Sequence, residues 1–253
     1  MRLQNKINNS LLKKKLAFTL AEVLIVISII GIVAEIVIPD IVADVFDSYS
    51  LAMVKEDYSI LQQSIKIVET NNGTSFSDCY IGGNSLDAAT DAVTSIIAAN
   101  LKIAKDCGRN PGCFSPNGYK YLADGFNGLH SPLNLDDAAT FSMNKMILAN
   151  GSSLGIVVKS LILGPAPSYS LYQVDFFVDV NGLKGPNRLG YDTFLFRIFN
   201  RQAFGPWWAP NNNQNNDKGC YSATIGFTGQ GYGCAGWAVY YNTVKYKNGE
   251  ILP

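Results

Sequence analysis

Hydrophobic and polar positions follow one pattern at the start of the chain. Residues 18–38 form an apolar run of 21 residues, preceded by a polar segment that ends in Lys13, Lys14 and Lys15. At about 1.5 Å per helical residue, this run spans the roughly 30 Å hydrocarbon core of a membrane. Glu22 interrupts it near its start, where an unpaired carboxylate in lipid is costly. The pattern predicts a membrane-spanning helix with a charge that a simple anchor does not need.

A second pattern follows, in which apolar positions become periodic. They recur in alternating steps of three and four residues, as on one face of a helix, at Leu51, Val54, Tyr58, Leu61, Ile65 and Val68. Residues 71–73, Asn-Asn-Gly, are types that end helices. We therefore expect one helix over residues 18–70, about 80 Å long if straight. Pro39 should kink it, because its ring removes a backbone donor.

Beyond residue 73, the pattern predicts one more helix and several strands. Residues 86–100 have a candidate N-cap in Ser85 and an apolar face made of Leu86, Ala89, Val93 and Ile96. Strand-like runs follow at 141–149, 154–163, 169–180 and 193–199, and Asn150-Gly151 is a hairpin signal. From Gly205 onward no element can be assigned. The expected fold class is α+β, a long N-terminal helix whose second half packs on an antiparallel sheet.

The junction of the basic segment and the apolar run resembles the leader of type IV prepilins and of type II secretion pseudopilins. In that family a peptidase cuts just before a Phe that is then N-methylated, and the fifth residue after the cut is Glu. The resemblance implies cleavage between Ala17 and Phe18, methylation of Phe18, and Glu22 at the fifth position. Gly31 and Pro39 also match glycine and proline positions common in the family.

Two residues depart from the family pattern. Ala17 stands where Gly is usual before the cut, which would slow processing. Glu35 places a second acid where a small apolar residue is usual. Because Glu35 lies near the outer end of the apolar run, we expect it to reach water. The resemblance covers about residues 13–70.

The resemblance also implies an organisation and a function. It divides the chain into a cleaved leader (1–17), a transmembrane and assembly helix (18–39), its amphipathic continuation (40–72) and an extracytoplasmic α+β head (73–253). The expected function is a non-enzymatic subunit of a type IV pilus or a type II secretion pseudopilus. The implied partners are prepilin peptidase, copies of the chain and related pilins in a helical filament, and an inner-membrane assembly platform. The alternative is a membrane-anchored binding protein or adhesin that does not polymerise.

In the assembly that we expect, Glu22 pairs with the ammonium of a neighbouring subunit's Phe18. Such a pair would set the axial stagger between helices, because an unpaired buried charge is costly in any other register. The alternative for Glu22 is a tolerated charge near the membrane interface that reaches toward the headgroups.

The distribution of charge predicts the orientation of the chain in the membrane and argues against nucleic acid as a partner of the head. The chain has 20 basic and 20 acidic side chains. Five basic residues and no acid lie in residues 1–17, so the remainder carries a net charge of −5. Without a basic patch, nucleic acid is not an expected partner of the head. The positive leader places the N-terminus in the cytoplasm of a bacterial cell and the head outside it, where disulfides form.

Five cysteines leave one unpaired if the others form bridges. Cys107 and Cys113 flank a turn-rich segment, and Cys220 and Cys234 enclose a glycine-rich one. We expect these two local pairs, with Cys79 free. The alternative is a bridge between Cys79 and Cys107.

Residues 179–192 combine oxygen ligands and glycines between two predicted strands. Asp179, Asn181, Asn187 and Asp192 could supply side-chain oxygens to calcium, although no cofactor is required. The pattern is not an EF-hand, since its spacing and closing Glu are absent. The alternative is a hairpin turn capped by its own side chains.

Two further motifs were weighed for binding and catalysis. The pair Trp207-Trp208 has two interpretations. It is an exposed aromatic surface that binds sugars or a partner, or it is part of a half-buried core. His130 is the single histidine, and no HExxH motif accompanies it. We therefore expect no enzymatic activity.

Overall fold

The computed structural model describes residues 19–76, 85–122, 133–137, 142–163, 169–199, 203–207, 220, 231–244, 246–247 and 250–251. The chain divides into two compact units, Met1–Val45 and Phe46–Pro253. Helix α1 (Leu20–Asn72) supplies residues to both and is continuous through Pro39. The kink at Pro39 stays a prediction.

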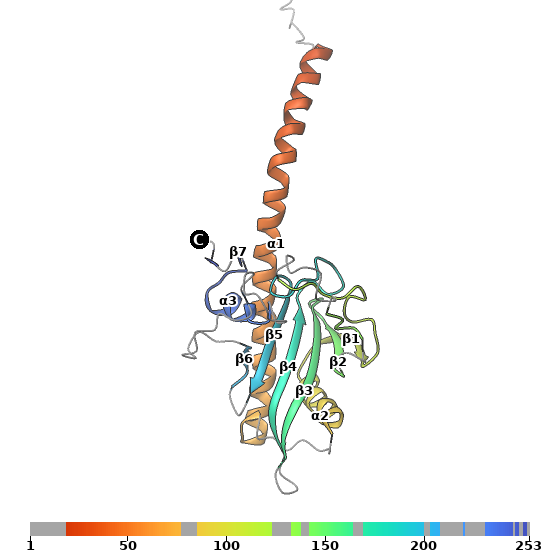
Figure 1. Cartoon of the computed structure of the whole chain (residues 1–253), viewed down its shortest axis with the longest axis vertical. Helices are drawn as coiled ribbons and strands as arrows, with labels where there is room; N and C mark the ends of the chain where they lie inside the picture. The colour runs from red at the N-terminus through yellow and green to blue at the C-terminus, as the bar shows by residue number, and fades with distance from the viewer. Residues whose placement is uncertain are drawn as a thin grey trace, which may run out of the picture. The chain divides into compact units, whose positions relative to one another are not determined.

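The fold of the second unit is α+β, as predicted. A six-stranded antiparallel sheet has the order β1-β2-β3-β4-β5-β6 (Figure 1). Its strands are β1 (Ile103–Gly108), β2 (Asn144–Leu148), β3 (Ser153–Leu163), β4 (Tyr169–Asp179), β5 (Thr193–Phe199) and β6 (Gly205–Pro206). The other elements are α2 (Leu86–Ala98), α3 (Cys234–Tyr240) and a small hairpin of β7 (Tyr246–Lys247) and β8 (Glu250–Ile251).

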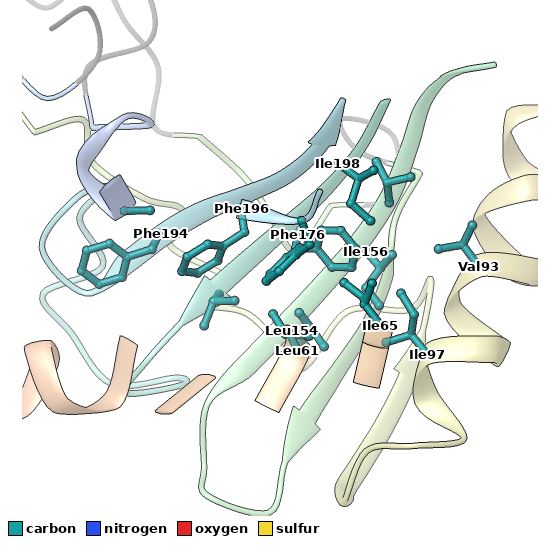
Figure 2. Close-up of a cluster of buried hydrophobic side chains, with 14 of the residues drawn as sticks. Leu61, Ile65, Val93, Ile97, Leu154, Ile156, Phe176, Phe194, Phe196 and Ile198 are labelled. Carbon is teal, nitrogen blue, oxygen red and sulfur yellow. The ribbon is translucent and has the colours of Figure 1, made fainter. Parts of the chain in front are cut away.

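The main core lies between the helices and one face of this sheet. Figure 2 shows α1 and α2 contributing side chains that meet those of β3, β4 and β5. Leu61 of α1, Ile97 of α2 and Phe176 of β4 have no exposed surface. Burial of such side chains is the main term that holds an amphipathic helix on a sheet.

A second hydrophobic cluster covers the opposite face. Phe177 and Leu195 lie in it, whereas their chain neighbours Phe176 and Phe194 lie in the main core. Successive residues of a strand point to opposite faces, so β4 and β5 are buried on both sides. This explains the consecutive apolar residues at 176–178 and 194–196.

The apolar stripe expected on α1 is present but rotated slightly. Leu51 and Tyr58 are only half-buried, and three polar side chains complete the stripe: Ser50, Asp57 and Ser64. Ser64 donates a hydrogen bond to the carbonyl of Ile97 (3.0 Å). α1 ends two residues later than predicted, before Gly73, which adopts the positive φ typical of a helix end.

The expected helix at 86–100 is α2, and its cap is confirmed: the Ser85 side chain accepts a hydrogen bond from the amide of Ala88. The predicted apolar face was partly wrong, because Leu86 is 44% exposed and Ile97 rather than Ile96 is fully buried. Thr90 explains the rotation. Its hydroxyl accepts a hydrogen bond from the amide of Val158 (3.0 Å), which turns this polar residue toward the sheet.

Four of the strands follow the predicted runs, whereas β1, β6, β7, β8 and α3 were not predicted. The hairpin at Asn150-Gly151 joins β2 to β3, with Gly151 at φ 94°. β1 escaped prediction because two register irregularities, between Ile103 and Lys105 and between Asp106 and Gly108, break the period of two. α3 spans only seven residues within a glycine-rich segment.

Candidate functional site: the N-terminal half of α1 and the loops of the head

The N-terminal half of α1, residues 20–45, consists mostly of exposed aliphatic side chains. Every Leu, Ile and Val in this range is exposed, from 43% at Val37 to 79% at Leu20. Among the helices described, α1 is the one long and apolar enough to cross a membrane. Exposed apolar surface of this extent is unfavourable in water. These side chains need lipid or other helices around them.

Glu22 belongs to a capping box at the start of α1. The amide and hydroxyl of Thr19 each donate a hydrogen bond to Oε2 of Glu22 (both 2.8 Å), and the amide of Glu22 donates to the Thr19 hydroxyl (3.2 Å). This exchange satisfies helix-terminal donors and places an acid at the positive end of the helix dipole. The Thr-Leu-Ala-Glu sequence is the signal for this motif, and our sequence analysis did not use it.

The other polar side chains of this half are arranged differently. Ser28 donates its hydroxyl proton to the carbonyl of Leu24 (2.7 Å), which satisfies it within the helix. Glu35 is exposed and lies 13 residues beyond Glu22. At 3.6 residues per turn, the two carboxylates point about 140° apart around the helix axis. They therefore cannot both face the same neighbouring helix.

The loop between β4 and β5 brings together the four residues that sequence analysis assigned to calcium. The Asp192 carboxylate accepts hydrogen bonds from the amides of Asn187 and Arg188 (2.7 Å each) and from the Asn181 side chain (3.3 Å). Asp179 accepts from the Tyr119 hydroxyl (2.7 Å) and the amide of Asn181 (3.2 Å). These donors organise the loop by themselves.

Both carboxyl groups in this loop titrate abnormally. Burial raises the pKa of Asp179 well above its usual range, and the charge of Asp192 raises it further. Burial also raises the pKa of Asp192, against the hydrogen bonds that favour its charged form. The side-chain oxygens of Asn181 and Asn187 have no hydrogen-bond partner. Two amide oxygens beside two buried acids are suitable calcium ligands. Calcium binding by this loop stays a prediction.

Two disulfides fasten the head, and they join the pairs expected from the sequence. Cys107 is bonded to Cys113, and Cys220 to Cys234. Because Cys107 is bonded to Cys113, the alternative bridge between Cys79 and Cys107 is not formed. Cys79 itself lies outside the described residues. The Cys107–Cys113 loop is also held by Asp136, whose carboxylate accepts hydrogen bonds from the amides of Gly112 and Phe114.

Trp207 is packed against the second hydrophobic cluster. Its ring lies 5.3 Å from the guanidinium carbon of Arg197 and meets Tyr232 edge-on at 6.4 Å. Arg197 in turn forms two hydrogen bonds with the Asp175 carboxylate (2.5 and 2.9 Å). This arrangement favours the half-buried interpretation of Trp207.

Several predicted site residues fall outside the described part of the chain. They are Ala17 and Phe18 at the expected cleavage site, together with His130 and Trp208. Within the described ranges, no group of three or more His, Cys, Asp or Glu side chains is placed to hold a metal ion.

Comparison with known families identifies the N-terminal segment. Residues 12–34 match the prokaryotic N-terminal methylation motif, the prepilin-type cleavage and methylation signal of type IV pilins and pseudopilins. No curated protein and no solved structure matches the chain. The matched residues include Glu22 and its capping partner Thr19. The chain therefore carries the N-terminal signal of pilin-type precursors, joined to an α+β architecture like that of pilins.

Proposed function

We propose that the chain is a structural subunit that prepilin peptidase cuts between Ala17 and Phe18 and that then polymerises through α1. The product is a filament of the type IV pilus or type II secretion pseudopilus class. Before assembly, the subunit resides in the bacterial inner membrane with its N-terminus in the cytoplasm and its head outside. The assembly platform in that membrane would extract it into the filament.

The observation that supports this function best is a carboxylate within an entirely exposed aliphatic surface. A lipid environment satisfies the Leu, Ile and Val side chains between residues 20 and 45, but it does not satisfy an ionised Glu22. The capping hydrogen bonds from Thr19 reach only Oε2 of Glu22. A neighbouring subunit's Phe18 ammonium, created by cleavage, is the cation that this carboxylate needs.

The charge pair would favour one register between helices. A methyl group on the Phe18 nitrogen leaves its positive charge in place. Helices that slide out of register would bury both charges unpaired, which is strongly unfavourable. Aliphatic packing along α1 then supplies attraction, while Glu22 and Phe18 supply specificity.

The test is to isolate sheared surface material and membranes from cells that contain prepilin peptidase. We expect filaments whose subunit begins at N-methylated Phe18, identified by mass spectrometry of the N-terminal peptide. An intact leader of residues 1–17 on membrane-bound protein would contradict processing. Processed protein found only in membranes would favour the alternative, an anchored binding protein or adhesin.

A further inference from the structure

A charged cluster lies on the face of the sheet that carries the second hydrophobic cluster. Asp175 of β4 and Arg197 of β5 stand directly opposite each other in the strand register. They lie two residues from Phe177 and Leu195 of the second cluster, so they share its face. Asp175 is 3% exposed, and the Arg197 side chain is 18% exposed. Both charges are therefore largely removed from water.

A second cation interacts with the same carboxylate. Lys159 lies at a register irregularity of β3, between Val158 and Ser160, a kind of distortion that redirects side chains. Burial lowers the pKa of the half-buried Lys159 ammonium, the charge of Asp175 opposes this lowering, and the charge of Arg197 adds to it. Two cations thus share one acid, and these three side chains carry a net charge of +1.

The carboxylate of Asp175 does not use all the donors around it. A guanidinium carries five N–H donors, and Asp175 accepts two of them, from Nε and Nη2 of Arg197 (2.5 and 2.9 Å). The side-chain amide of Gln173 approaches the same two carboxylate oxygens (3.3 and 3.2 Å). Within the ranges that the structure describes, Arg197 donates no further hydrogen bond. Three of its donors, on Nη1 and Nη2, therefore remain for a ligand or for water.

Two half-buried aromatic rings flank these donors. Trp207 lies 5.3 Å from the guanidinium carbon of Arg197, and Tyr232 meets Trp207 edge-on at 6.4 Å. Burial raises the pKa of the Tyr232 hydroxyl, and the charges of Asp175 and Arg197 also act on it, so Tyr232 lies close to the charged cluster. Apolar rings beside a cation keep water away from it, which strengthens its attraction for an anion.

We propose that Arg197 and Lys159 form a binding site for an oxyanion, the carboxylate or phosphate group of a ligand. The free edge of the Arg197 fork, Nη1 and Nη2, donates to two oxygens of this group, and the Lys159 ammonium donates to it as well. The anion offsets the net positive charge that Asp175 leaves. Asp175 is then a positioning residue, because its two hydrogen bonds orient the guanidinium. This site belongs to the head and requires neither membrane anchoring nor polymerisation.

The test is isothermal titration calorimetry of the full chain in detergent at pH 7. Sodium phosphate and sodium acetate are titrated separately, and sodium chloride keeps the ionic strength constant. We expect saturable binding to one site per chain, and the tighter of the two anions identifies the preferred group. The variant Lys159→Gln should weaken binding about tenfold, the equivalent of one charge-assisted hydrogen bond. Lys159→Arg keeps the charge and should retain most of the affinity.

The matched control is Lys184→Gln, which removes an exposed lysine from the loop between β4 and β5 and should bind as the wild type does. Absence of saturable binding with both anions would overturn the proposal and leave the remaining donors of Arg197 to water. Equal affinities of Lys159→Gln and the wild type would also overturn it, and so would an equal loss in Lys184→Gln. Because the titration reads neither cleavage nor filaments, its failure would leave the proposed function untouched.

Discussion

Between Leu20 and Val45, α1 exposes every Leu, Ile and Val, whereas between Ser50 and Val68 the same helix buries seven side chains. The exposed half is more hydrophobic than the buried one. Three of the seven buried residues are polar, namely Ser50, Asp57 and Ser64. Hydrophobicity alone therefore does not show which half packs within its own chain. The spacing of apolar positions does, because a uniform apolar surface suits lipid or several neighbouring helices and a stripe suits one sheet.

The two halves also treat their acids differently. Glu22 is exposed and held by Thr19 in a capping box. Asp57 has no exposed surface, and its Oδ1 accepts a hydrogen bond from Asn150 in the β2–β3 turn (2.8 Å), while Oδ2 has no hydrogen-bond partner. The first acid is exposed, as the proposed charge pair between subunits requires. The second is enclosed by its own head.

Replacement of one leucine in each half should sharpen this contrast most. Leu61→Ala leaves a cavity in the main core and should destabilise the head by about 2–5 kcal/mol. Leu24→Ala should leave head stability unchanged, because Leu24 is 51% exposed. Denaturant unfolding of each full-length variant in detergent measures both. A comparable loss from Leu24→Ala would show that the exposed half packs on the head.

Both disulfides lie in the head, and they should contribute different amounts to its free energy of unfolding. Bridge Cys220–Cys234 closes a longer loop than bridge Cys107–Cys113, with sequence separations of 14 and 6. Chain entropy predicts losses of about 3 and about 2 kcal/mol when each pair is replaced by alanine. Thermal unfolding of the two double variants gives the order. The reverse order would contradict the chain-entropy account of these two bridges.

Asp57 should make the stability of the head depend on pH. Burial raises the pKa of Asp57 from 3.8 to about 6, so the folded state binds its proton more tightly than the unfolded state does. This stabilising contribution is complete below the unfolded pKa and is lost as the pH rises through the folded value. The variant Asp57→Asn should therefore gain stability over the wild type between pH 4 and pH 7, by about 2–3 kcal/mol.

Urea unfolding across this pH range provides the measurement. The control is Glu56→Gln, which removes the exposed neighbouring acid and should preserve most of the pH dependence, because the charge of Glu56 is the smallest contribution to the raised pKa of Asp57. A pH-independent difference between Asp57→Asn and the wild type would show that Asp57 does not titrate in the folded state in this range.

The calcium hypothesis gives the smallest expected effect. Because the β4–β5 loop contacts α1 through Tyr191 and Phe46, calcium bound there would support the start of the buried half. Chelation should then lower the Tm by about 2–4 °C, equivalent to about 1 kcal/mol of bound-state stabilisation. The variant Asn187→Ala should not respond to chelation. Superimposable melting curves of the wild type with and without chelator would leave the loop as a self-capped turn.

The sequence was sufficient where one physical signal acted alone. The apolar run, the Ser85 cap and the run that became β5 were each predicted from local pattern, and β5 has the predicted bounds. Prediction failed where tertiary contacts override the pattern. The hydrogen bond from Val158 to Thr90 rotated α2, and bulges concealed β1. The pairing of Asp57 with Asn150 joins residues 93 positions apart, which no local pattern reports.

The most direct measurement of the central claim compares filament yield for Glu22→Ala and Glu35→Ala. Glu22→Ala removes the partner proposed for the Phe18 ammonium and makes the span more apolar, so membrane insertion should persist. Sheared filaments, normalised to membrane-bound protein, should fall roughly tenfold or more, since an unpaired buried charge is costly. Glu35→Ala, on another side of the helix, should assemble normally. Wild-type filament yield from Glu22→Ala would contradict the account.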